Sequence, residues 1–200
     1  MQKSKIDWCD MTWNPVVGCR RNCSYCYAKR MNTRFKWIPE WTEPQFFENR
    51  LLEPSKVKKP STIFVGSVSD IAFWKKEWTE AVLTICQGCS QHTFMFLTKD
   101  PTIYEGYKFP DNCMLGVTLT DRRLINFSIE RFYDIPCKQK FISIEPILST
   151  FTYMKFRNID LIIVGAMTGA GAKPPKKEWI DSIQHSNIHW KANIKKYLSR

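Results

Sequence analysis

Short apolar runs recur along the chain, and they constrain its fold more than any other feature. Most of them are solidly apolar and do not alternate with polar residues. A strand of this kind is covered on both faces, as in a parallel sheet. The six runs are Thr12–Val17, Thr62–Val65, Thr93–Leu97, Met114–Leu119, Lys140–Ile144 and Leu161–Val164.

Stretches with helical periodicity lie between several of these runs. Four sets of large apolar residues recur at helical spacing: Tyr27, Met31 and Phe35; Trp74, Trp78, Val82 and Ile85; Ile125, Ile129 and Phe132; Trp179, Ile180 and Ile183. Strands that alternate with helices favour a parallel α/β sheet.

A complete eight-fold barrel needs about 250 residues, whereas this chain has 200. The length therefore predicts α/β architecture with parallel strands in a partial (β/α)6 TIM-type barrel, in which strand and helix alternate six times. We expect residues 1–200 to form a single domain, with Ile188–Trp190 as an extra strand. Four prolines between Pro39 and Pro60 predict a surface excursion there.

Basic residues exceed acidic ones by 30 to 19, and the whole excess lies at the two ends of the chain. Residues 1–36 hold eight basic and two acidic residues, residues 173–200 hold seven and two, and residues 37–172 hold fifteen of each. Such an excess attracts polyanions, nucleic acid first, although a basic surface without a partner is an equally open interpretation. In a partial barrel the two ends border the gap, so we expect this charge beside the site.

The sequence contains neither an apolar run long enough for a transmembrane helix nor the apolar stretch of a signal peptide near Met1. We therefore expect no membrane association and a cytoplasmic location. In that compartment the eight cysteines are better interpreted as thiols, metal ligands or catalytic groups than as disulfides.

Three of these cysteines form a C-x3-C-x2-C motif in Cys19-Arg20-Arg21-Asn22-Cys23-Ser24-Tyr25-Cys26. The motif follows a predicted strand and opens a predicted helix. Thiolates select zinc, copper(I) or an iron–sulfur cluster. A closed zinc site needs four ligands, so three thiolates leave one metal position open. Zinc and unligated thiols remain alternatives at this point.

The motif, its place in the chain and the chain length resemble the radical S-adenosylmethionine (SAM) superfamily, in which an aromatic residue, here Tyr25, precedes the last cysteine. The chain is also similar to a family of short, phage-associated radical-SAM-like proteins. That similarity rests on these segments: Ile6-Asp7-Trp8 through Thr12-Trp13-Asn14-Pro15-Val16-Val17-Gly18-Cys19, Cys26-Tyr27-Ala28, Ile63-Phe64-Val65-Gly66-Ser67-Val68-Ser69-Asp70, Phe96-Leu97-Thr98-Lys99, Leu115-Gly116-Val117-Thr118, Ser143-Ile144-Glu145-Pro146 and Ile162-Ile163-Val164-Gly165. The sequence departs from the family at Cys19–Cys23, where the spacing is short, at Asp100 and at Ala166-Met167-Thr168.

The resemblance implies that Cys19, Cys23 and Cys26 hold a 4Fe-4S cluster and act as the catalytic centre. SAM would bind the iron that lacks a protein ligand, and an outside one-electron reductant such as flavodoxin or ferredoxin would supply the electron. Reductive cleavage of SAM then gives methionine and a 5′-deoxyadenosyl radical, which abstracts hydrogen from the substrate.

Ligands collect at the carboxyl ends of parallel strands, so the polar residues that close each strand are the candidate cofactor-binding residues. With Tyr25 from the cysteine loop, they are Gly66, Ser67, Ser69, Asp70, Thr98, Lys99, Thr118, Ser143, Glu145 and Gly165. Each has an equally plausible structural role: Asp70 suits a helix N-cap, and Lys99 and Glu145 suit a salt bridge with each other.

Other motifs carry weaker predictions. Cys86-Gln87-Gly88-Cys89, with Cys113 or Cys137, has the ligand types for an auxiliary metal site, but small buried thiols are common. The three histidines lack metal-ligand spacing and suit packing or surface roles. Trp8 and Trp13 flank the cysteine loop and are candidates to shield a cluster from solvent.

The substrate remains open in the sequence. The basic ends and the phage-type resemblance favour a monomeric enzyme that acts on nucleic acid or a nucleotide, for example by modifying or isomerising a base in phage DNA within the phage or host cytosol. The alternatives are a radical enzyme acting on a peptide or small metabolite and a non-catalytic metal-binding module that binds nucleic acid.

Overall fold

The computed structural model describes residues 1–122, 127–169 and 171–198. Its main sheet has eight strands in the order β1-β2-β5-β6-β7-β8-β9-β10. All neighbours pair parallel except β1 and β2, which are antiparallel. These strands are β1 (Gln2–Lys3), β2 (Met11–Trp13), β5 (Thr62–Val65), β6 (Thr93–Thr98), β7 (Cys113–Thr118), β8 (Gln139–Ile144), β9 (Leu161–Val164) and β10 (Ile188–Trp190).

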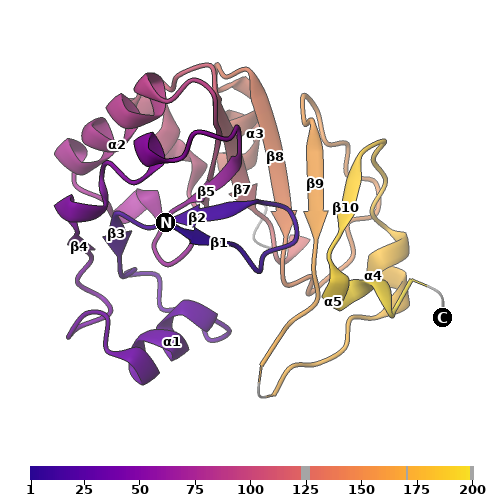
Figure 1. Ribbon diagram of the computed structural model, residues 1–200. Helices are drawn as coiled ribbons and strands as arrows, with labels where there is room; N and C mark the ends of the chain where they lie inside the picture. The colour runs from indigo at the N-terminus through magenta and orange to yellow at the C-terminus, as the bar shows by residue number, and fades with distance from the viewer. Residues whose placement is uncertain (123–126, 170, 199–200) are drawn as a thin grey trace.

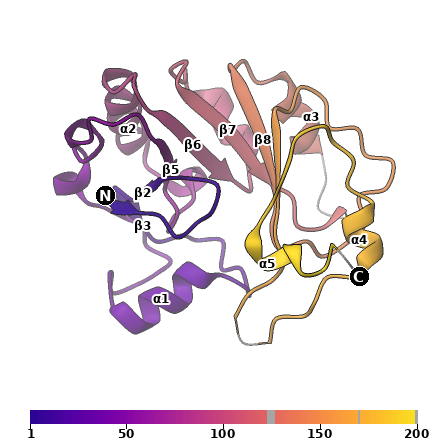
Figure 2. The same cartoon turned by 45° about the vertical axis from the view of Figure 1, so that its right-hand side comes forward.

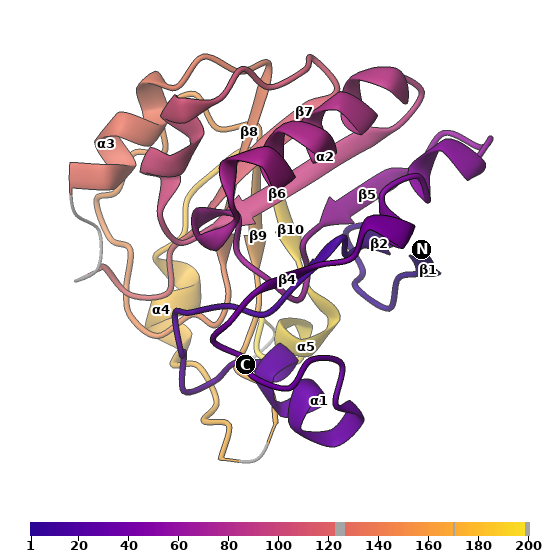
Figure 3. The same cartoon turned by 90° about the vertical axis from the view of Figure 1, so that its left-hand side faces the viewer.

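The helices lie in two places relative to this sheet. Figure 3 shows α2 (Lys76–Gly88) and α3 (Phe127–Asp134) across one face of β5 to β8. Figure 1 shows α1 (Tyr27–Phe35), α4 (Lys177–Asp181) and α5 (Ala192–Lys195) along the lower edge, where the parallel strands end. The helices with basic residues from both chain ends therefore lie at one edge of the molecule.

Side chains along each strand alternate between two packed faces. The outer face packs against the helices, where Ile63, Phe94 and Leu115 join Val82 and Phe132 in the largest apolar cluster. The inner face of the curved sheet, visible in Figure 2, carries a second cluster of Met95, Met114, Phe141 and Ile163. Trp8 and Leu97 pack against this second cluster. Burial on both faces explains why the runs are solidly apolar.

The predicted fold class, a partial barrel of parallel strands, is confirmed, and so is the extra strand at Ile188–Trp190. Strict alternation of strand and helix is wrong for two connections. The connection from β6 to β7 contains a 3-10 helix, η4 (Pro101–Gly106), and residues 145–160, all described, carry no helix between β8 and β9. In the predicted helix before Phe132, Ile125 lies outside the described residues.

The predicted first strand, Thr12–Val17, is two strands. Residues 14 and 15 interrupt it, because Pro15 has no N–H to donate to a sheet neighbour. The second piece, β3 (Val16–Val17), leaves the main sheet and pairs with β4 (Gln45–Phe46). The proline-rich excursion therefore contains β4 together with three-residue 3-10 turns, η1 (Glu48–Arg50) and η2 (Pro54–Lys56).

Candidate functional site

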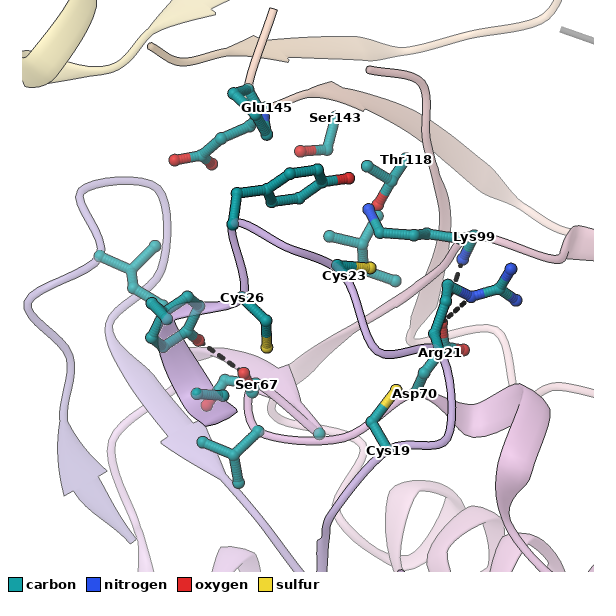
Figure 4. Close-up of a pocket in the computed structure, with 18 of the residues that line it drawn as sticks. Cys19, Arg21, Cys23, Cys26, Ser67, Asp70, Lys99, Thr118, Ser143 and Glu145 are labelled. Carbon is teal, nitrogen blue, oxygen red and sulfur yellow. Dashed lines mark hydrogen bonds and ion pairs between the residues drawn. The ribbon is translucent and has the colours of Figure 1, made fainter. Parts of the chain in front are cut away.

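A cavity of about 380 Å³ opens at the carboxyl edge of the sheet. Figure 4 shows the cysteine loop on one side of it and Thr118, Ser143 and Glu145 on the other. Of the residues predicted for the site, these line the cavity: Cys19, Cys23, Tyr25, Cys26, Gly66, Ser67, Ser69, Asp70, Thr98, Lys99, Thr118, Ser143 and Glu145. The structure thus brings together residues from five separate parts of the chain.

The cysteine loop connects β3 to α1 and is fixed at both ends by backbone hydrogen bonds. The Cys19 N–H donates to the carbonyl of Trp41 over 2.9 Å, and the Cys26 N–H donates to the carbonyl of Cys23 over 3.1 Å. The Cys26 side chain is the N-cap of α1 and accepts from the Lys29 N–H at 3.4 Å. All three thiols are free and partly exposed.

Gly18 holds this loop against the segment that follows β5. Its N–H donates to the carbonyl of Val68 over 3.1 Å, and it forms an isolated parallel bridge with Ser69. Gly18 has a φ of 107°, and a Cβ there would lie 2.9 Å from the carbonyl oxygen of Trp41. The close approach of these segments requires glycine.

The three thiols are the ligand type that zinc and iron–sulfur clusters bind. Burial, with a smaller contribution from negative charge on Asp70, Cys23 and Cys26, raises the pKa of Cys19 to about 11. A bound cation reverses this penalty, because metal ligation favours the thiolate. Within the described residues, no three Cys, His, Asp or Glu side chains are close enough to hold one metal ion. A cube binds each thiolate through a different iron, so its ligands lie further apart.

Asp70 has a structural role as well as a place in the cavity wall. It is the N-cap of η3 (Ile71–Phe73), accepting from the Ala72 N–H at 3.1 Å. It also accepts from the Thr98 hydroxyl at 2.6 Å and from the Lys99 N–H at 3.3 Å. Asp70 therefore joins the ends of β5 and β6, which confirms the N-cap interpretation.

Positive charge lines the same wall. The Arg21 Nε lies 3.6 Å from Asp70 Oδ2, without the geometry of a hydrogen bond. The Lys99 Nζ lies 5.6 Å from the centre of the Tyr25 ring, and burial lowers the pKa of Lys99. Arg21 belongs to the cysteine loop and Lys99 lies beside it, and the two cations suit an anionic group of a ligand.

The serines after β5 are already hydrogen-bonded within the protein. Ser67 Oγ donates to Asn14 Oδ1 over 3.1 Å, and the carbonyl of Ser67 accepts from the Tyr27 hydroxyl at 2.5 Å. Ser69 Oγ accepts from Trp74 Nε1 at 3.2 Å. Their hydrogen bonds shape the turn after Gly66, which has a φ of 71°.

Glu145 pairs with Lys191, so the expected salt bridge with Lys99 is wrong. The Lys191 Nζ lies 2.5 Å from Glu145 Oε1. Gly165 does not line the cavity but lies behind this carboxylate, where a Cβ would be 2.9 Å from Glu145 Cδ. Its role is to leave room for the Glu145 side chain.

Sequence reasoning missed several lining residues, including Lys191, Asn193 and Ile6. The first residues of the chain reach the cavity because Asp7 Oδ2 accepts from the Ala192 N–H at 2.7 Å, and Asp7 Oδ1 lies 3.3 Å from His189 Nε2. Lys191 directly follows the predicted extra strand, and this strand-end position could have identified it as a lining residue. Contacts between the two chain ends leave no local pattern in the sequence, so they could not be predicted from it.

Of the two tryptophans expected beside the loop, one lines the cavity. Trp8 lines the cavity, and its ring lies 4.7 Å from that of Phe64. Trp13 is fully buried in the larger core cluster instead, where its Nε1 donates to the carbonyl of Arg50.

The second cysteine pair belongs to the core. Cys86, Cys89 and Cys113 are buried there, and burial raises the pKa of Cys86 well above its ordinary value. They form no group that could hold a metal among the residues the structure describes. Their burial in the apolar core fits the small-buried-thiol interpretation.

Comparison with solved structures finds proteins that share this fold. Spore photoproduct lyase complexed with dinucleoside spore photoproduct has a TM-score of 0.57 and 11% identity, covering 82% of this chain and 58% of that one. A variant with bound AdoMet and dinucleoside spore photoproduct has a TM-score of 0.54 and 11% identity, covering 73% and 48%. The chain thus spans about half the length of these structures. Comparison with curated proteins finds no match.

Nearly the whole chain also matches one family model. The family described as "Protein of unknown function (DUF5131)" aligns with residues 3–194. Because this match covers nearly the full length and all of the cavity-lining residues, the chain belongs to the DUF5131 family.

Proposed function

We propose that this protein is a radical SAM enzyme that acts on nucleic acid or a nucleotide. One observation carries the proposal: the three thiols of the C-x3-C-x2-C loop line the same cavity as the polar residues that end the parallel strands. The spore photoproduct lyases that share the fold bind a dinucleoside, and one has AdoMet bound. The phage association remains a prediction.

In this proposal Cys19, Cys23 and Cys26 hold a 4Fe-4S cluster through their thiolates, leaving one iron for SAM. When bound, the cluster and SAM supply one-electron cleavage of the sulfonium and hydrogen abstraction. We propose the strand-end residues and Tyr25 as the surroundings of SAM. The electron comes from an outside donor such as flavodoxin or ferredoxin.

The residues around the cavity have different proposed roles in ligand binding. Arg21 and Lys99 bring positive charge beside the cysteine loop, where they attract a carboxylate or phosphate. Lys191 binds Oε1 of Glu145. The other carboxylate oxygen can accept hydrogen bonds from hydroxyl groups of a ligand. Asp70 acts mainly as a positioning residue, since its oxygens already hold the ends of β5 and β6.

The apolar part of the cavity excludes water. Trp8, Phe64 and Leu97 line it, next to the hydroxyls of Thr118 and Ser143. A dry wall prevents side reactions of a reactive radical.

The described helices include none long and apolar enough to cross a membrane. We propose a single-domain monomer working in the cytoplasm.

Anaerobic reconstitution tests the proposal. Treatment with iron and sulfide should give a brown protein with about four irons per chain, as expected for one 4Fe-4S cluster. Reduction in the presence of SAM should release 5′-deoxyadenosine. Cys23→Ala should lose both signals. Cys137→Ala is the matched control, because Cys137 is a free thiol outside the cavity. A colourless protein that binds zinc and leaves SAM intact would favour the metal-binding module instead.

A further inference from the structure

The outward face of α1 carries exposed apolar and basic side chains together. Five large apolar side chains are exposed in the described part of the chain, and three of them, Tyr27, Met31 and Phe35, lie on α1. Their spacing of four residues places them on one face of the helix. The sequence predicted a helix here, but its apolar stripe faces outward and does not join the core.

The buried contacts of α1 explain this orientation. Ala28 and Asn32 are the buried residues of the helix. The Asn32 side chain donates to the carbonyl of Ile38 over 3.1 Å and accepts from the Ile38 N–H at 3.0 Å. This pair of hydrogen bonds fixes the chain after the helix, and Trp37 stacks on Phe35 with ring centres 6.0 Å apart and planes at 16°.

The sequence that contains α1 is basic. Residues 11–39 include six Arg or Lys and lack Asp and Glu. In the described ranges, only Arg21 of these six forms an ion pair with a carboxylate. Arg34 lies over the Phe35 ring at 5.1 Å. Arg30 reaches across to the carbonyl of Thr168, a cavity-lining residue, over 3.3 Å.

The face begins at the cavity and leads away from it. Tyr27 lines the cavity, and Phe35 lies eight residues further along α1. At 1.5 Å per residue, the two are separated by about 12 Å along the helix axis. This equals about three to four nucleotides of a stacked strand at 3.4 Å each.

We propose that this surface, formed by Tyr27, Arg30, Met31, Arg34, Phe35 and Trp37 and here named the α1 surface, binds a single strand of nucleic acid whose reacting nucleotide enters the cavity. Proteins bind single strands by stacking bases on aromatic rings within a positively charged groove, with Arg adding cation–π contacts. The α1 surface combines aromatic rings with arginine side chains, and its apolar residues are mainly aromatic. The inference rests on the proposed function and names a strand, rather than a free nucleotide, as the substrate.

Oligonucleotide binding measured by fluorescence anisotropy tests this inference. A fluorescent hexanucleotide should bind more tightly than a dinucleotide, which is too short to reach Phe35 from the cavity. Phe35→Ala should weaken hexanucleotide binding about five- to a hundredfold, the range for loss of one base–aromatic stack. It should leave binding of the dinucleotide and of an abasic strand unchanged.

Two control variants separate stacking and charge from general surface effects. Leu52→Ala removes an exposed apolar side chain elsewhere and should not change binding. Arg34→Gln should lower the slope of log affinity against log salt by about 0.7 for one phosphate contact, whereas Lys58→Gln should not.

The outcomes distinguish this inference from the proposed function. If reconstituted enzyme cleaves SAM but the hexanucleotide does not bind, or binds no better than the dinucleotide, the α1 inference is wrong and the enzyme assignment stands. If Phe35→Ala leaves strand binding unchanged but slows reduction by flavodoxin, the surface serves the electron donor and the inference fails. Strand binding without SAM cleavage refutes the enzyme assignment alone.

Discussion

Gly116 provides a direct test of how the barrel interior is packed. It lies in β7 opposite Phe141 of β8. A Cβ at Gly116 would be 2.6 Å from Phe141 Cε2 and closer still to two other ring atoms. Ordinary carbon contacts are about 3.5–4.0 Å, so the nearest ring atom would have to move by more than about 1 Å. Phe141 is fully buried, with Met95, Met114 and Ile163 in the same cluster, so it lacks space to move.

Gly116→Ala should therefore destabilise the protein by about 3 kcal/mol, the upper end of the range for overpacked cores. For a chain of this size, that corresponds to a melting temperature about 6–12 °C lower. Thermal denaturation followed by circular dichroism measures the change. Gly88→Ala is the control, because a Cβ at the end of α2 meets nothing within 4 Å. It should be neutral or stabilise the helix by up to about 1 kcal/mol.

A double-mutant cycle isolates the contact. Phe141→Leu removes the ring atoms that the new methyl group would meet, so Gly116→Ala should cost less in that background. We expect a coupling of about 1–3 kcal/mol, typical of residues in direct contact. Additive effects of the two substitutions, or an unchanged melting temperature for Gly116→Ala, would refute this account of the inner face.

Three further predictions concern the site and its surroundings. Asp70→Asn places an amide where an oxygen accepts from the Lys99 N–H, so it should cost about 1–3 kcal/mol of stability in urea denaturation; an unchanged midpoint would contradict the positioning role. Gly165→Ala pushes Glu145 from its position and should weaken SAM binding in calorimetry with little change in melting temperature; full affinity would show that this carboxylate is not needed for SAM. Burial raises the pKa of Tyr133 to about 12 from its ordinary value of 10.0, so the stability that it contributes is present below pH 10 and is lost as the pH rises toward 12. Tyr133→Phe should remove that part of the loss of stability at alkaline pH. Identical profiles of unfolding free energy against pH for the unmodified protein and the variant would disprove this prediction.

The local sequence determined most of the architecture and of the cavity wall. Solid apolar runs indicated strands buried on both faces, and parallel order puts all their carboxyl ends at one edge. The strand-end residues Gly66, Lys99, Thr118, Ser143 and Glu145 therefore meet in one cavity with the cysteine loop. This prediction needed only the type of each element and its order in the chain.

Contacts between distant segments were decided by the tertiary structure. Glu145 pairs with Lys191 because β9 and β10 follow β8 in the sheet, which brings the last strand end beside that carboxylate. The apolar stripe of α1 faces outward because Asn32 and Ala28 provide the inner contacts of the helix. Periodicity shows that a helix has an apolar face, but only the packed neighbours determine which face is buried, since the hydrophobic contribution depends on surface removed from water in the folded chain.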